Sequence, residues 1–100
     1  MFTYYYEERA GASDVVTETE NQYVASIDLP GVSKEDINLD IDDGYLVVSA
    51  IRKSNKAKKT RYVKLYKNVD PQAITASLSD GVLSVQLPKK EKEKIKISIE

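Results

Sequence analysis

The chain has 100 residues, 41% hydrophobic and 31% charged with a net charge of −1, which indicates one small folded domain. No apolar run approaches the ~20 residues of a membrane-spanning helix, and the opening MFTYYYEERA lacks the pattern of a secretory signal. The chain contains no cysteine or histidine, which excludes disulfides, thiol or histidine catalysis and most zinc sites. We therefore expect a cytoplasmic protein that is not an enzyme, needs no cofactor or metal and has no membrane partner.

The charges are divided unevenly along the chain. Residues 1–43 hold eleven Asp and Glu against Arg9 and Lys34, whereas residues 44–100 hold thirteen Lys and Arg against five Asp and Glu. Opposite charges on two parts of one chain favour head-to-tail attraction between copies. We prefer the simpler interpretation that two strongly charged surfaces keep a small sheet protein soluble.

Apolar and polar residues alternate with a period of two along most of the chain, which predicts strands with one buried face. In chain order the alternating segments are residues 23–29, 37–41, 45–51, 61–67, 74–78 and 82–87. Pro30-Gly31 ends the first segment, and Asp43-Gly44 and Asp80-Gly81 are typical of two-residue hairpin turns. So many short strands joined by tight turns predict an all-β antiparallel sandwich.

Three further segments lie between the predicted strands. Residues 33–36 and 70–73 have the character of a helix start, but each is only about one turn long, so we expect turns that lead into strands. Residues 52–61 are polar and basic with no apolar period, which predicts a loop or ragged strand ends.

The two ends differ from this middle region, so we divide the chain into an arm (1–12), a sandwich domain (13–88) and a tether plus tail (89–100). The arm has no evident partner strand, and its aromatic residues are Phe2, Tyr4, Tyr5 and Tyr6. In the tail, polar residues alternate with Ile95, Ile97 and Ile99. Three isoleucines on one side of so short a segment cannot bury one another, so we expect them to dock on their own sheet or on another chain.

The acidic residues offer only weak candidates for a catalytic site or a metal site. The carboxylate pairs Glu35/Asp36 and Asp42/Asp43 lack the apolar surroundings that would raise a pKa into a catalytic range. Asp40 and Asp42 share one strand face and suggest a loose divalent cation site. We prefer the interpretation that they are charges on an exposed strand, and we expect no metal.

A basic cluster interleaved with Tyr62 and Tyr66 raises nucleic-acid binding as an alternative. Its members are Arg52, Lys53, Lys56, Lys58, Lys59, Arg61, Lys64 and Lys67. Such a surface stacks bases and neutralises phosphates. However, the sequence pI is about 5.5, whereas a dedicated binder usually exceeds ~9. We expect a solvated basic loop and no nucleic acid, and keep a single-stranded nucleic-acid-binding β protein as the alternative from a different class.

Three segments carry a resemblance to a known family. Residues 28–37 read DLPGVSKEDI, residues 76–83 read ASLSDGVL before Leu87-Pro88-Lys89, and residues 95–99 read IKISI. They resemble the opening of the alpha-crystallin domain of small heat-shock proteins, its A-x-x-x-x-GVL signature and the family's I-x-I tail. The motifs occur in the family's order, and the resemblance extends from about residue 14 to residue 100.

The resemblance implies an immunoglobulin-like β-sandwich, a homo-oligomer built from dimers, and ATP-independent binding of partly unfolded clients during stress. In the family the tail docks in a groove that here would lie between residues 37–41 and 74–78. The candidate groove residues are Leu39, Ile41, Ile74 and Leu78. Reversible occupancy of an apolar groove is what a holding chaperone requires, and the arm would add surface for clients and assembly.

The sequence also departs from the family pattern. Only residues 52–60 stand where many members have a longer loop with a strand swapped between partners. Pairing of the 61–67 strands is the other dimer geometry, with Tyr62, Lys64 and Tyr66 as interface candidates. Lys64 stands where the family has an arginine, and it cannot form the same bidentate contact with a carboxylate. The second alternative is a CS-domain co-chaperone of the same architecture, against which the I-x-I tail argues.

Overall fold

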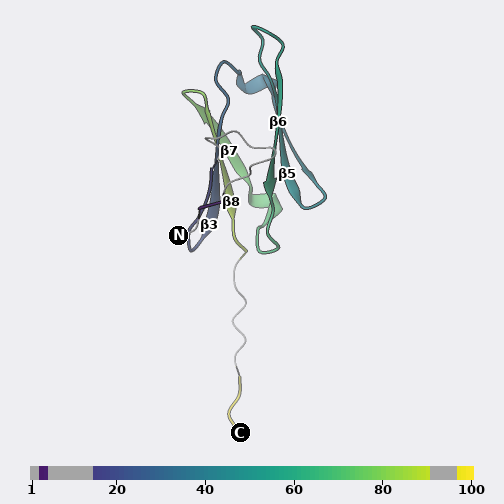
Figure 1. Ribbon diagram of the computed structural model, residues 1–100. Helices are drawn as coiled ribbons and strands as arrows, with labels where there is room; N and C mark the ends of the chain where they lie inside the picture. Colours follow the sequence, from purple (N-terminus) through teal and green to yellow (C-terminus); the bar gives the residue numbers. More distant parts are fainter. Residues whose placement is uncertain (1–2, 5–14, 91–96) are drawn as a thin grey trace.

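The computed structural model describes residues 3–4, 15–90 and 97–100. Within them, strands form two antiparallel sheets that pack face to face, which confirms the all-β sandwich (Figure 1). In chain order the elements are β1 (Thr3–Tyr4), β2 (Val15–Glu18), β3 (Gln22–Asp28), the 3-10 turn η1 (Lys34–Asp36), β4 (Ile37–Asp42), β5 (Tyr45–Ile51), β6 (Lys58–Lys64), the 3-10 turn η2 (Pro71–Ala73), β7 (Thr75–Ser79) and β8 (Val82–Pro88).

The order of the strands determines which of them lie at sheet edges. The larger sheet has the order β1-β2-β3-β8-β7, and the smaller sheet has the order β4-β5-β6. Within the described residues, β7 therefore ends one sheet, and β4 and β6 are the two edges of the other. Every strand pair is antiparallel, so two-residue turns are sufficient to connect β4 to β5 and β7 to β8.

The core lies between the sheets and follows the alternation of the sequence. Every second residue of β3, β5 and β8 is buried, as expected for strands with one face toward a core. These side chains are Tyr23, Ala25, Ile27, Leu46, Val48, Ala50, Leu83, Val85 and Leu87. The period-two predictions for residues 23–29, 45–51 and 82–87 are confirmed.

The predicted tight turns have the expected backbone. Asp43 and Gly44 have φ of 48° and 80°, and Asp80 and Gly81 have φ of 51° and 76°. Positive φ at both central residues is the requirement of a type I′ hairpin turn. Asp and Gly are common at such positions because they tolerate the left-handed region better than branched side chains do.

The two single turns also form where the sequence predicts them. η1 follows Ser33 and leads directly into β4. η2 is capped by Asp70, whose Oδ1 accepts a hydrogen bond from the Gln72 amide at 3.1 Å. Neither turn, nor any other helix in the described ranges, has the length and apolarity needed to cross a membrane.

One predicted strand is displaced along the chain. We expected a strand over 61–67 and a loop over 52–61, but β6 comprises Lys58–Lys64. The register pairs Ile51 with Lys58 and Tyr45 with Lys64, so every residue of β5 has a partner. Main-chain pairing with β5 therefore extends the strand into a segment whose side chains show no apolar period.

At the start of the chain, two strands form where none was expected. Thr3 and Tyr4 pair with Thr17 and Val16, so the arm has a partner strand at this point, contrary to our expectation. That partner, β2, consists of four residues, too short for a clear alternation. Its β-branched Val15-Val16-Thr17 run was the available signal.

Candidate binding groove

An apolar groove lies between edge strands of the two sheets. It has a volume of about 410 Å³. β4 and the preceding η1 supply one side, β7 the other, and β8 the inner wall. The lining residues are Lys34, Ile37, Leu39, Ala76, Ser77, Leu78 and Leu83.

The alternation of the strands explains why the groove is apolar. Ile37 and Leu39 are two residues apart on β4, so their side chains share a face. Leu78 of β7 lies opposite Leu83 of β8 in the register. Leu83 is buried, whereas Ile37, Leu39 and Leu78 are only partly covered and pack against the core.

The main chain adds a second recognition element to the groove. Because β4 and β7 are sheet edges within the described residues, each has a row of N–H and C=O groups without a strand partner there. An extended peptide can hydrogen-bond to such a row while its alternate side chains enter the apolar lining.

The structure brings together two of the four predicted groove residues. Leu39 and Leu78 both line the groove. Ile41 does not, and it is 52% exposed near the far end of β4. Ile74 does not either, because it follows η2 and packs against the core. Whether any of the four binds a tail or client stays a prediction.

Five lining residues were missed by sequence reasoning. They are Lys34, Ile37, Ala76, Ser77 and Leu83. Ile37 shares the alternation of Leu39, and Leu83 belongs to the GVL signature, so both carried a usable signal. Lys34 carried none, because its position depends on how η1 meets the larger sheet.

The described end of the tail is exposed. Ile97 and Ile99 are 83% and 99% exposed, and residues 97–100 lie away from both sheets (Figure 1). Ile95 and the tether over 91–94 lie outside the described residues. Two large apolar side chains in water have a strong tendency to find an apolar surface.

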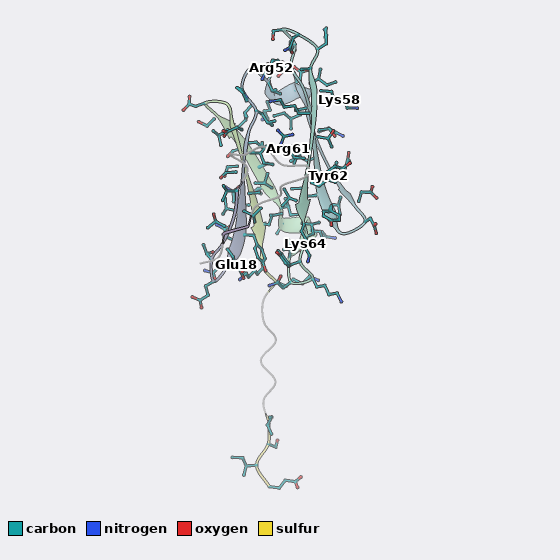
Figure 2. All side chains as sticks on the ribbon, viewed as in Figure 1. Glu18, Arg52, Lys58, Arg61, Tyr62 and Lys64 are labelled. Atoms are coloured by element: carbon teal, nitrogen blue, oxygen red, sulfur yellow. The ribbon has the colours of Figure 1, made fainter. Side chains whose placement is uncertain are left out.

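The residues proposed for a dimer interface do not share one strand. Tyr62 and Lys64 lie on the same face of β6 (Figure 2), and the Tyr62 ring contacts that of Tyr45 edge-on, with centroids 6.2 Å apart. We had expected Tyr66 to be the next residue on that face. It is not, because β6 ends at Lys64. Its ring instead stacks on Tyr23 of the other sheet. A role in dimer formation stays a prediction for all three.

Much of the basic cluster is used within the domain. Arg52 Nε donates a hydrogen bond to the Pro30 carbonyl at 2.9 Å. Arg61 lies on the core side of β6 and points between the sheets (Figure 2). Within β6, Lys58 and Lys64 lie on one face and Lys59 on the other, which disfavours one continuous phosphate-binding surface.

Lys53, another member of this cluster, forms an ion pair with η1. Its Nζ lies 2.9 Å from Glu35 Oε1 and 3.5 Å from Asp36 Oδ2. The hydrogen bond from Lys53 lowers the pKa of Glu35, and the same bond raises the pKa of Lys53. Both acids of η1 are thereby engaged by one lysine.

The remaining candidate residues carry no assembled site. Asp40 accepts a hydrogen bond from Asn38 Nδ2 at 2.7 Å. The part of the chain that the structure describes holds no cluster of three or more potential metal ligands. In the arm, Tyr4 belongs to β1, whereas Phe2, Tyr5 and Tyr6 lie outside the described residues.

Comparison with known proteins agrees with this geometry. Residues 15–100 match the Hsp20/alpha crystallin family. Small heat shock protein C4 of Rickettsia felis is 34% identical, with 81% of this chain and 58% of that protein aligned. Heat shock protein HSP.16.4 of Streptococcus thermophilus is 36% identical, with 84% and 70% aligned. The chain therefore spans 58% and 70% of the length of these two relatives.

Solved structures show the same sandwich. A small heat-shock protein from Xylella fastidiosa superposes with a TM-score of 0.74 at 28% identity, covering 92% of this chain and 98% of that one. Heat shock protein 16.0 from Schizosaccharomyces pombe gives 0.69 at 29% identity, covering 88% and 74%. With the family match over most of its length, the chain belongs to the Hsp20/alpha crystallin family of small heat-shock proteins, which are chaperones, and its sandwich is an alpha-crystallin domain.

Proposed function

We propose that this protein is an ATP-independent holdase that binds partly unfolded clients in the groove between β4 and β7. The observation that carries the proposal is a partly covered apolar groove between two sheet edges, in a chain whose own Ile97 and Ile99 are exposed. An exposed apolar segment of a client has the features that such a groove accepts, namely an extended main chain and alternate apolar side chains. Binding of this kind involves no catalytic residue and no cofactor.

The same groove would connect subunits of a homo-oligomer. In this proposal Ile95, Ile97 and Ile99 of one subunit dock beside Leu39 and Leu78 of another. Burying an isoleucine contributes about 1.5–3 kcal/mol, whereas ordering each tail residue costs about 1–2 kcal/mol. Because the two terms nearly cancel, the tail would leave the groove readily and admit a client.

The remaining parts of the chain have supporting roles in the proposal. Dimers would form through the edge strand β6, with Tyr62 and Lys64 on the pairing strand and Tyr66 next to it. The arm, with Phe2, Tyr4, Tyr5 and Tyr6, would add aromatic surface for assembly and clients. A cytoplasmic location is supported by a sequence without cysteine, which suits a reducing compartment.

The test removes the three tail isoleucines together. We expect Ile95→Ala/Ile97→Ala/Ile99→Ala to reduce the assembly to dimers by light scattering, with an unchanged sheet spectrum by circular dichroism. The control Lys92→Ala/Lys94→Ala alters the tether without removing an apolar side chain and should keep the mass of the wild type. An unchanged mass in the isoleucine variant would exclude the tail from the mechanism.

The chaperone activity itself requires a separate measurement. The full chain should suppress aggregation of a heated test protein without ATP, and the isoleucine variant should retain suppression because its groove is uncovered. The holdase function would be contradicted if adding ATP abolished the suppression. It would also be contradicted if the full chain gave no suppression at an equimolar ratio to the test protein. Sub-micromolar binding to single-stranded DNA that falls steeply with salt would favour the nucleic-acid alternative instead.

A further inference from the structure

The outer face of the smaller sheet is apolar along its central strand. In an antiparallel sandwich the face of a sheet that points away from the core is normally polar. β5 departs from this rule, because its buried residues alternate with the outward side chains Tyr45, Val47, Ser49 and Ile51. Tyr45 and Ile51 are 41% and 45% exposed. A strand that is apolar on both faces is typical of one that is covered on both sides, and exposed apolar side chains gathered on one face mark an interaction surface.

The outer face of the larger sheet provides the contrast. Its central rows of cross-strand neighbours are Ser26 with Ser84 and Ser77, and Val24 with Gln86 and Thr75. These side chains are mostly hydroxyls and amides. Among the described residues of this face, Val82 at the start of β8 is the one large apolar side chain that is exposed. The apolar outer face is therefore a particular feature of the smaller sheet.

Opposite charges flank the apolar centre of the smaller sheet. Residues that are partners in the register share a face. From β4 to β6 the outward rows are Asp42 with Tyr45 and Lys64, Asp40 with Val47 and Tyr62, and Asn38 with Ser49 and Thr60. Asp40 and Asp42 are exposed on the edge strand β4, and Lys58 and Lys64 are exposed on the edge strand β6 (Figure 2). The face thus has a negative edge, an apolar centre and a positive edge.

We propose that a second copy of this chain covers this face, sheet against sheet, around a two-fold axis that runs parallel to β5. This rotation exchanges the two edges, so the negative edge of each copy lies over the positive edge of the other. Asp42 then meets Lys64 of the partner subunit, and Val47 and Ser49 each meet their own equivalents. A two-fold axis across the strands would place β4 on β4 and β6 on β6, where like charges oppose the contact.

This contact uses neither the groove nor the main-chain edge of β6, so it does not depend on the docking of the tail and is compatible with both proposed contacts. The face consists of three strands of six or seven residues and measures roughly 14 Å by 20 Å. A standard interface buries about 800 Å² on each partner. The contact is therefore weak by itself, and it strengthens an assembly whose other contacts already hold the copies close together.

Cysteine cross-linking tests the face, because the natural chain contains no cysteine. Ser49 and Ser84 are both half-buried serines near the middle of an outer face, one on each sheet. Full-length Ser49→Cys and Ser84→Cys are treated with a short bismaleimide, and the covalent dimer is measured on a denaturing gel. We expect Ser49→Cys to give about fivefold more dimer, since the contact holds the two thiols at a high effective concentration. Equal yields would overturn the proposal.

A mixed pair tests the direction of the two-fold axis. In the proposed arrangement Asn38 meets Thr60 of the partner subunit, so a mixture of Asn38→Cys and Thr60→Cys should give a heterodimer, identified by mass spectrometry of the linked peptides. Without that mixed link the proposal is wrong, whichever link replaces it. A link in Asn38→Cys alone would indicate an axis across the strands, and a link in Thr60→Cys alone would indicate pairing of β6 edges only.

A charge exchange tests the pairing of Asp42 with Lys64. In the Ser49→Cys protein we expect Asp42→Lys and Lys64→Glu each to lower the yield of dimer by about threefold, because like charges then meet. The combined variant should recover most of the yield. Asp28→Lys is the matched control, since Asp28 is an exposed aspartate that ends β3 on the outer face of the larger sheet, and it should leave the yield unchanged. If the combined variant recovers nothing, the edges are not paired in this way and the proposal fails.

Discussion

The ring of Tyr66 stacks on the ring of Tyr23, with centroids 4.9 Å apart and planes 19° from parallel. Tyr23 belongs to β3 of the larger sheet, whereas Tyr66 follows β6 of the smaller one, so the stack connects the two sheets. The Tyr23 hydroxyl donates to Asn68 Oδ1 at 3.2 Å, and Lys89 Nζ lies 5.0 Å from the centroid of the Tyr23 ring. The stack therefore lies where the chain leaves the sandwich for its tether.

Removing the Tyr66 ring should destabilise the domain. Because the side chain is half-buried, we expect Tyr66→Ala to lower the free energy of unfolding by about 2 kcal/mol, through lost packing and aromatic contact. Urea unfolding at fixed protein concentration measures the change. Tyr66→Phe keeps the ring and should lose less than half as much; an equal loss in both variants would show that the stack contributes little.

Lys89, at the start of the tether, contacts the connection between β2 and β3. Its Nζ lies 2.6 Å from Glu18 Oε2 and 2.8 Å from the Thr19 carbonyl, and its side chain is only 17% exposed. Lys89→Met keeps an unbranched side chain of nearly the same length but removes the charge. We expect a loss of about 1–2 kcal/mol in urea unfolding, because charged hydrogen bonds at a poorly solvated site are lost. The exposed neighbour provides the control, and Lys90→Met should change stability by less than about 0.5 kcal/mol.

A polar substitution in the groove should affect both assembly and client binding. Leu78→Ser places a hydroxyl where an apolar ligand would rest, while Leu78 is only half-buried in the single chain. We expect the assembly to shrink and the concentration needed to suppress aggregation to rise at least fivefold. This result differs from that of the tail variant, which should keep suppression. Thr75→Ser, on the same strand but outside the lining, is the control, and an effect as large as that of Leu78→Ser would argue against the groove.

The glycine of the first hairpin turn should tolerate only certain replacements. Gly44 has φ of 80° with open space around the position that a Cβ would take, so backbone conformation alone decides the cost. Gly44→Val should lower stability by about 1–2 kcal/mol, since branched side chains avoid this region. Gly44→Asn should lower stability clearly less, because asparagine adopts this backbone region more readily than valine does. Thermal unfolding of the two variants side by side is sufficient, and equal losses would contradict the conformational explanation.

The ion pair on η1 predicts a small dependence of stability on pH. The hydrogen bond from Lys53 lowers the pKa of Glu35 below its ordinary value of 4.5, so the folded state favours the carboxylate. The stabilisation is therefore present above that ordinary value and is lost as pH falls through the lowered pKa. We expect Glu35→Gln to shift the urea midpoint downward at about pH 7 and to have no effect at about pH 2.

Salt provides the check on this pair. Both side chains are well exposed, at 59% for Lys53 and 68% for Glu35, so added salt should screen most of the effect. Glu20→Gln removes another exposed carboxylate and serves as the control for a change in net charge. If it shifts the midpoint at about pH 7 as much as Glu35→Gln does, the contact with Lys53 contributes nothing specific.

Local features of the sequence were sufficient for most of the fold. The buried faces of residues 23–29, 45–51 and 82–87 follow from alternation, because successive side chains of any strand point to opposite sides. The Asp-Gly pairs at 43–44 and 80–81 predict their turns because few other residues adopt two successive positive φ angles. The family motifs depend on the same short segments, so the architecture was predictable as well.

The tertiary structure decided what no short segment contains. β6 begins at Lys58, where β5 offers main-chain partners, and Tyr66 lies beyond the end of that strand with its ring stacked on Tyr23 of the other sheet. The groove includes Leu39 and Leu78 but not Ile41 or Ile74, and it has Lys34 at one end. These outcomes depend on where each strand ends and how the two sheets are stacked. Both are set by contacts between residues far apart in the sequence, which alternation along a single strand does not record.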